Sequence, residues 1–137
     1  MKLSIIIVAY MAPEKLLKCL ESLLRNPPES GRTSKADAEI ILIDNSPEPI
    51  ERAISNDFLI TLLQTYAQVI TEWPPENPGF AAACNIGAAK ASGQNLVFVN
   101  PDTEIFPEWA ERMQSYLLPG VGGVGPISNF VAGWQNA

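Results

Sequence analysis

The chain has 137 residues, 47% of them hydrophobic, and a formal net charge of −6 without any histidine. This length and composition predict one globular domain with a buried core, and they exclude imidazole-based proton transfer and histidine metal ligation. The absence of a cluster of Lys and Arg argues against nucleic acid as a partner.

The first half of the chain alternates apolar runs with a helical pattern. The continuous run from Leu3 to Ala9 predicts a strand that is covered on both faces. Pro13 opens a helical pattern of leucines, which ends at Asn26-Pro27-Pro28. Residues 29–37 are polar and predict a loop, and the second apolar run extends from Glu39 to Ile43.

The second half continues this alternation. Ile50 to about Tyr66 is ambiguous and has only weak helical spacing. The remaining predictions are a strand over Ala67–Trp73, an Ala-rich helix over Phe80–Ser92 that Gly93 stops, a strand over Leu96–Val99, a helix over Phe106–Leu118, and a short strand or turn over Gly120–Ile127.

Strands that alternate with helices predict a mostly parallel open sheet of α/β type, flanked by helices. Right-handed crossovers bring the carboxyl ends of the first, second and fourth strands to one edge, where ligands of such sheets bind. Tyr10, Asp44 and the pair Asn100 and Asp102 follow these three strands. Their convergence predicts a ligand site better than any of these side chains alone.

The segment Asn100-Pro101-Asp102-Thr103 places a carboxylate and a carboxamide after the fourth strand. One Asp with nearby oxygen groups suits a hard divalent cation, which completes its coordination with waters and substrate phosphates. The same segment is an ordinary turn sequence, because proline fixes φ and Asp bonds its own backbone. Both interpretations remain open from the sequence.

Two further segments also have two interpretations each. Gly79, in Asn77-Pro78-Gly79-Phe80, would let backbone approach a ligand before a helix N-terminus, or it forms a turn before a packing helix. Asp44 would accept a hydrogen bond from a base or sugar, or it forms an Asx turn.

Gly120–Gly125 matches G-x-G-x-x-G, but Pro126 follows at once, so a turn is predicted and no dinucleotide site. The tryptophans are predicted to be packing residues.

Together, these segments resemble the N-terminal half of a family 2 glycosyltransferase with the GT-A fold, similar to its rhamnosyltransferase-like members. The resemblance covers residues 3 to about 105 and keeps the order of the family's motifs. The matching segments are Ser4–Tyr10, Ile41–Ser46, Asn77–Gly87 and Phe98–Glu104.

The resemblance implies a nucleotide site. Tyr10 and the backbone at Ala9 would flank the base, and Asp44 would accept a hydrogen bond from it. The nucleotide and ribose region would be lined by Asn77, Gly79 and Asn85. The donor would be a UDP- or dTDP-sugar.

The resemblance also implies a metal site. Asp102 would bind Mg²⁺ or Mn²⁺ at the donor diphosphate, and Asn100 stands where the family usually has another Asp. The family's catalytic base lies further downstream, so residues 1–137 are expected to form a donor domain that is inactive alone. The resemblance implies inverting transfer to a saccharide or lipid-linked acceptor, in polysaccharide biosynthesis.

Other classes of function remain. One is a non-catalytic nucleotide-binding or interaction module, and another is a nucleotidyltransferase-like enzyme, which would need more basic phosphate contacts. Cys19 and Cys84 lack CxxC spacing and predict free thiols in a reducing compartment. The expected location is the cytoplasm, either free or peripheral to the inner face of the membrane. Self-association is expected through an apolar patch of Val121, Val124, Ile127, Phe130 and Trp134.

Overall fold

The computed structural model describes residues 3–28, 36–49 and 54–126. The chain forms two compact units, Met1–Pro107 and Glu108–Ala137. All four strands described, and three of the helices, belong to the first unit. The predicted single donor domain spans both units and stays a prediction.

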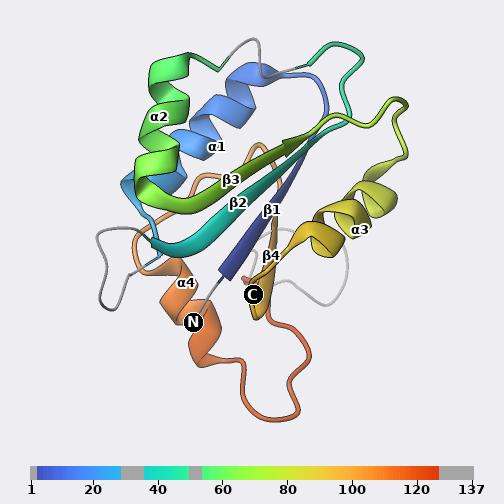
Figure 1. Cartoon of the computed structure of the whole chain (residues 1–137). Helices are drawn as coiled ribbons and strands as arrows, with labels where there is room; N and C mark the ends of the chain where they lie inside the picture. Colours follow the sequence, from blue (N-terminus) through green and yellow to red (C-terminus); the bar gives the residue numbers. More distant parts are fainter. Residues whose placement is uncertain (1–2, 29–35, 50–53, 127–137) are drawn as a thin grey trace. The chain divides into compact units, whose positions relative to one another are not determined.

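The first unit is a four-stranded parallel sheet with the strand order β3-β2-β1-β4 (Figure 1). This arrangement confirms the predicted parallel α/β fold. The strands are β1 (Leu3–Ala9), β2 (Ala36–Asp44), β3 (Tyr66–Glu72) and β4 (Asn95–Val99), and the helices are α1 (Pro13–Arg25), α2 (Asn56–Thr65) and α3 (Phe80–Lys90).

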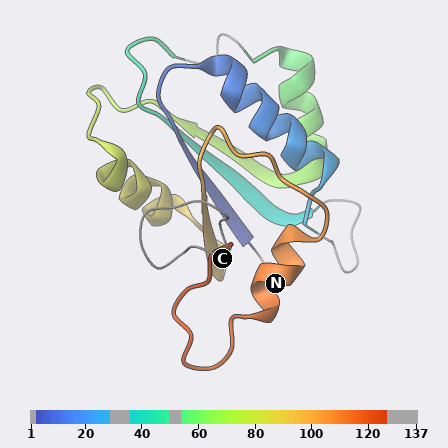
Figure 2. The same cartoon turned by 180° about the vertical axis from the view of Figure 1, so that it is seen from behind.

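The two central strands, β1 and β2, are buried along almost their whole length, as continuous apolar runs predict. Helices α1 and α2 lie on one face of the sheet and α3 on the other, as the two opposite views show (Figure 1, Figure 2). The core on the α3 face is built from Ile6, Val8, Ile41, Ile43 and Ala83. Both edge strands are less buried, and Phe98 of β4 is 51% exposed.

Helix α1 begins and ends where the sequence predicted. Pro13 occupies its first turn, where a missing N–H costs nothing. Its buried face contains four apolar side chains, and one polar residue, Ser22, lies among them. The apolar members are Leu16, Cys19, Leu20 and Leu23.

Helix α3 ends two residues earlier than predicted, at Lys90. Ser92 leaves the helix because its N–H donates to Oε1 of the fully buried Glu39 at 2.6 Å, and its hydroxyl lies 2.9 Å from the same oxygen. Gly93 is therefore not the helix stop. A Cβ at Gly93 would lie 2.6 Å from Ser4 Oγ and 2.7 Å from Ser4 N, so this glycine permits close contact with β1.

The second unit departs further from the prediction. Helix α4 covers only Trp109–Ser115, because Pro107 and the left-handed Glu108 (φ 61°) precede it. Residues 120–126 form no strand, and Gly120 lies in a turn. The other predicted strand residue, Ile127, and the patch residues Phe130 and Trp134 lie outside the described residues.

The second strand begins at Ala36, three residues before the predicted start. Residues 29–35 of the predicted loop lie outside the described part of the chain. The ambiguous segment before β3 contains helix α2, whose N-cap Ser55 accepts from the Phe58 N–H at 3.2 Å. No helix among the described residues combines the length and apolar character needed to cross a membrane.

Candidate functional site

A hollow of about 320 Å³ lies at the carboxyl ends of β1 and β4. The parallel pairing of Ile7 with Val99 brings the segments after these two strands side by side. Tyr10, Asn100 and Asp102 therefore line one space, whereas Asp44, which was predicted to converge with them, does not line it. The other lining residues are Val8, Met11, Ala12, Lys15, Phe80 and Pro101.

The loop between β1 and α1 is strained. Met11 and Ala12 are consecutive non-glycine residues with positive φ, of 52° and 57°. Such backbone is uncommon and is concentrated at functional sites, where surrounding contacts hold it. Here Met11 N–H donates to Ser46 Oγ at 2.7 Å, and Ala12 O accepts from Lys15 N–H at 3.1 Å. Met11 and Ala12 form the lip of the hollow, and the hydrogen bond of Met11 fixes this lip to the segment that follows β2.

The Asp44 side chain forms a turn at the end of β2. Its Oδ1 accepts from Ser46 N–H at 3.0 Å, and the residue is only 2% exposed. Trp73, for which the sequence predicted only packing, donates its indole N–H to Ser46 O at 2.7 Å. Asp44 does not line the hollow beside Tyr10. Its recognition of a base therefore stays a prediction.

Asn45 is a residue that the sequence analysis did not select. Its N–H donates to Ala9 O at 2.8 Å, which extends the pairing of β1 with β2. Its side-chain Oδ1 is buried and has no hydrogen-bond partner among the described residues. An orphaned buried acceptor costs about 1–3 kcal/mol and calls for a bound water, ion or ligand. The sequence offered one indication that Asn45 is a candidate site residue, which is its position directly after Asp44 at the end of a strand.

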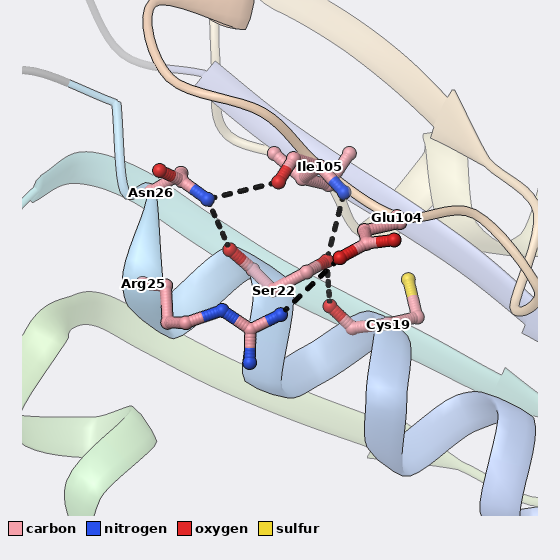
Figure 3. A network of polar contacts seen from close by, with 6 residues as sticks. All are labelled: Cys19, Ser22, Arg25, Asn26, Glu104 and Ile105. Atoms are coloured by element: carbon pink, nitrogen blue, oxygen red, sulfur yellow. Dashed lines mark hydrogen bonds and ion pairs between the residues drawn. The ribbon is translucent and has the colours of Figure 1, made fainter.

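Helix α1 holds the loop after β4 through its buried face (Figure 3). Ser22 Oγ accepts from Ile105 N–H at 2.9 Å and donates to Cys19 O at 2.7 Å. Asn26 Nδ2 donates to Ile105 O at 2.8 Å and to Ser22 O at 3.2 Å. These bonds fix the far end of the loop that carries Asp102.

Two weaker contacts hold the same loop at other points. The Cys19 thiol donates to Asn100 O at 3.7 Å, and Arg25 pairs with Glu104 at 3.7 Å across the surface (Figure 3). Within the loop, Thr103 N–H donates to Asn100 O at 3.1 Å, which closes a turn around Pro101 and Asp102. The turn and the ligand interpretation of this segment are therefore compatible, because the turn presents Asp102 to the hollow.

The pKa of the Cys19 thiol is raised to about 11, mainly by burial and also by the nearby Asp102 carboxylate, against a lowering contact from the Thr103 backbone. The thiol is therefore neutral near pH 7 and is a poor nucleophile. Burial also raises the pKa of Tyr66, whose hydroxyl donates to Leu23 O at 2.8 Å.

These raised pKa values predict a loss of stability in alkali. Below pH 9, the ordinary pKa of a thiol, the contribution of Cys19 is fully present, and it is lost as the pH rises toward 11 because the unfolded thiol ionises first. Between pH 8 and 10.5 the free energy of unfolding in urea should fall by about 2 kcal/mol from Cys19 alone. Cys19→Ala should remove this part of the fall, and an unchanged slope in that variant would contradict the assignment.

The segment before α3 contributes Phe80 to the hollow. Gly79 adopts φ 84°, and its N–H donates to Asn77 Oδ1 at 2.8 Å, which forms the turn expected of a Pro-Gly sequence. A Cβ at Gly79 would meet no atom within 4 Å, so the space beside it is open. Asn77 and Asn85 are exposed and do not line the hollow. Their roles, and that of Gly79, stay predictions.

The sequence profile of glycosyl transferase family 2 matches residues 4–129. The chain belongs to this family. No curated protein sequence matches it.

Solved structures agree with a GT-A glycosyltransferase fold. S. aureus TarS 1-349 in complex with UDP-GlcNAc is 19% identical over 85% of this chain and 31% of that chain, with a TM-score of 0.66. GalNAc-T7 with UDP, GalNAc and Mn²⁺ is 23% identical over 82% of this chain and 20% of that chain, with a TM-score of 0.62. The family 2 chain thus spans less than a third of the length of either structure.

The side chains that line the hollow suit a cation whose coordination is completed by waters and by the phosphates of a ligand. Among the described residues no group of three or more His, Cys, Asp and Glu side chains could hold a metal ion. Of the carboxylates in the described ranges, Asp102 alone lines the hollow, with the Asn100 amide beside it. Mg²⁺ and Mn²⁺ take one or two carboxylates and complete their coordination with waters and phosphates, so this donor set fits them.

Proposed function

We propose that this family 2 glycosyltransferase domain binds a nucleoside-diphosphate sugar in the hollow at the ends of β1 and β4. The observation that carries the proposal is the convergence of Tyr10, Asn100 and Asp102 on one space of about 320 Å³. The similar TarS structure, in complex with UDP-GlcNAc, and the similar GalNAc-T7 structure, with UDP, support it. The transfer would be inverting, to a saccharide or lipid-linked acceptor.

Asp102 would hold the divalent cation, and Asn100 would contribute an amide oxygen at most. When bound, the cation supplies positive charge to the diphosphate that leaves during transfer. The Mn²⁺ in the GalNAc-T7 structure supports this assignment. The protein is acidic, with a net charge of −6, so a bound cation would supply much of the positive charge that the diphosphate needs.

The nucleotide base would lie against Tyr10, whose ring is more than half exposed. Two acceptors stand at the neighbouring end of β2. One is Asp44, the predicted base contact, whose Oδ1 already serves the turn. The other is the orphaned Oδ1 of Asn45, which also does not line the hollow, so a ring N–H of uridine or thymidine would satisfy it once the side chain turns toward the base.

Calorimetric titration of the purified chain with UDP, dTDP, GDP and ADP, each with and without Mn²⁺, tests the proposal. We expect binding that Mn²⁺ strengthens, with UDP or dTDP preferred. An absence of nucleotide binding under all conditions would favour the alternative, a non-catalytic interaction module. Binding that is indifferent to Mn²⁺ would leave a nucleotide site but remove the proposed metal.

The same panel identifies the residue that reads the base. A buried acceptor rejects ligands that leave it unpaired, so Asn45→Ala should reduce the preference for UDP over ADP to about threefold or less. Asp44→Ala removes the acceptor of Ser46 N–H as well, whereas Asp44→Asn keeps an oxygen there. A ranking flattened only by changes at Asp44 would assign the base to Asp44, and an unchanged ranking in all variants would place base recognition elsewhere.

A further inference from the structure

We propose that Lys15 is the protein's own cationic contact to the diphosphate of the donor. This inference rests on the proposed function and extends it to a residue that neither the sequence motifs nor the family comparison selected. It begins from the shape of the surface around Asp102. A second hollow, of about 500 Å³, lies between α1 and residues 102–104. The hollow at the ends of β1 and β4, where the sugar donor would bind, is called the donor hollow. Lys15 and Asp102 line both the second hollow and the donor hollow.

The backbone holds Lys15 at this junction. Lys15 N–H donates to the carbonyl of Ala12, the second residue of the strained lip, at 3.1 Å. The side chain therefore starts from a fixed point at the edge of the donor hollow. Its four-carbon stem gives the ammonium group a reach of several ångströms across that space.

The charges in the donor hollow show what Lys15 contributes. Lys15 and Asp102 are the charged residues that line it, so their charges cancel. Asp102 and a diphosphate together bring about three negative charges, one divalent cation neutralises two of them, and the ammonium of Lys15 balances the third. In the described part of the chain no ion pair within 4 Å engages Lys15, whereas Arg25 pairs with Glu104 and Lys90 with Glu72. An ammonium that no carboxylate holds can bond phosphate oxygens, and such charge-assisted bonds are strong.

Asn100 makes this contact more important. With a second carboxylate at that position the site would hold its cation more tightly, whereas an amide adds no charge. The site therefore relies on one carboxylate for the metal and one ammonium for the phosphates. We expect part of the affinity for UDP to persist without metal, because Lys15 remains.

The test compares Lys15→Gln with Lys18→Gln, titrated with UDP and with uridine in 50 mM and 500 mM NaCl. Lys18 is one turn further along α1 and lines the second hollow but not the donor hollow, so it is a matched control. In low salt, Lys15→Gln should weaken UDP binding about tenfold, whereas Lys18→Gln changes it less than twofold. Uridine, which has no phosphate, should bind all three proteins equally, and Lys15→Arg should restore most of the affinity for UDP.

Three outcomes would overturn the inference while the proposed function stands: UDP affinity unchanged in Lys15→Gln, an equal loss in Lys18→Gln, or a parallel loss for uridine. The last would show that Lys15 shapes the lip and does not contact phosphate. A parent protein that binds neither UDP nor any other nucleotide would instead refute the proposed function itself. Circular dichroism of each variant confirms that folding is intact, as expected for an exposed side chain.

Discussion

Replacing Asp102 by asparagine is expected to abolish the gain in UDP affinity that Mn²⁺ provides, and to leave the fold intact. Asp102 alone among the described carboxylates lines the donor hollow, and it is exposed at the tip of its turn, so its replacement buries no unpaired polar group. Without a carboxylate the cation loses its protein ligand, and the Mn²⁺-dependent gain should fall on the order of 100-fold. Calorimetric titration with UDP at several Mn²⁺ concentrations measures this change.

The control is Glu104→Gln, in the same loop. Glu104 is exposed, does not line the donor hollow and pairs only across the surface with Arg25. An exposed ion pair contributes about 0–1 kcal/mol, so this variant should keep the Mn²⁺ effect. Equal Mn²⁺ dependence in Asp102→Asn and the parent would remove Asp102 from the metal site.

Replacing Ser22 by alanine is expected to destabilise the protein by about 2–3 kcal/mol and to weaken Mn²⁺-dependent UDP binding. Its hydroxyl is fully buried and bridges Ile105 N–H and Cys19 O, so removal leaves the amide without its acceptor. The loop that carries Asp102 then loses its anchor on α1 (Figure 3). Urea unfolding gives the first quantity, and calorimetry at a temperature where the variant is folded gives the second.

Ser115→Ala is the matched control for the hydroxyl itself. Ser115 also donates to the carbonyl three residues earlier in its helix, Arg112 O at 2.7 Å, but it is exposed and bridges no second segment. Its replacement should change the free energy of unfolding by less than about 0.5 kcal/mol. Similar small losses in both variants would show that Ser22 does not anchor the loop. Normal nucleotide binding by a destabilised Ser22→Ala protein would limit its role to stability.

The elements with strong local signals could be predicted from the sequence. The β-branched apolar run of β1 has one interpretation, because only a strand covered on both faces buries it fully. Helix α1 was delimited by Pro13 and by Asn26-Pro27-Pro28, which act through backbone geometry alone. The parallel sheet then followed from the alternation of strands and helices, and it brought Tyr10, Asn100 and Asp102 to one hollow but left Asp44 out of its lining.

Features that depend on contacts distant in sequence could not be predicted. The end of α3 is set by Glu39, about fifty positions earlier, so Gly93 alone was misleading. Lys15 looked like an ordinary exposed residue until the fold placed it beside Asp102. Ser22 did carry a signal, since a polar residue on the apolar face of a helix needs a partner. The predicted patch is described only in part: Val121 is exposed, and the predicted self-association stays a prediction.

The strand order also implies an order of events during folding. Among the described residues, strand β4 is the last in sequence, yet it pairs with the first, so that Leu3 lies beside Asn95. Chains fold from the N-terminus as they are synthesised, and pairings between distant segments form slowly. Strands β1, β2 and β3 can therefore associate while the edge of β1 that will pair with β4 is still unpaired. Because Asn100 and Asp102 follow β4 directly, we expect the donor site to form only when β4 joins the sheet, and a chain in which β4 is not yet paired to bind no nucleotide sugar.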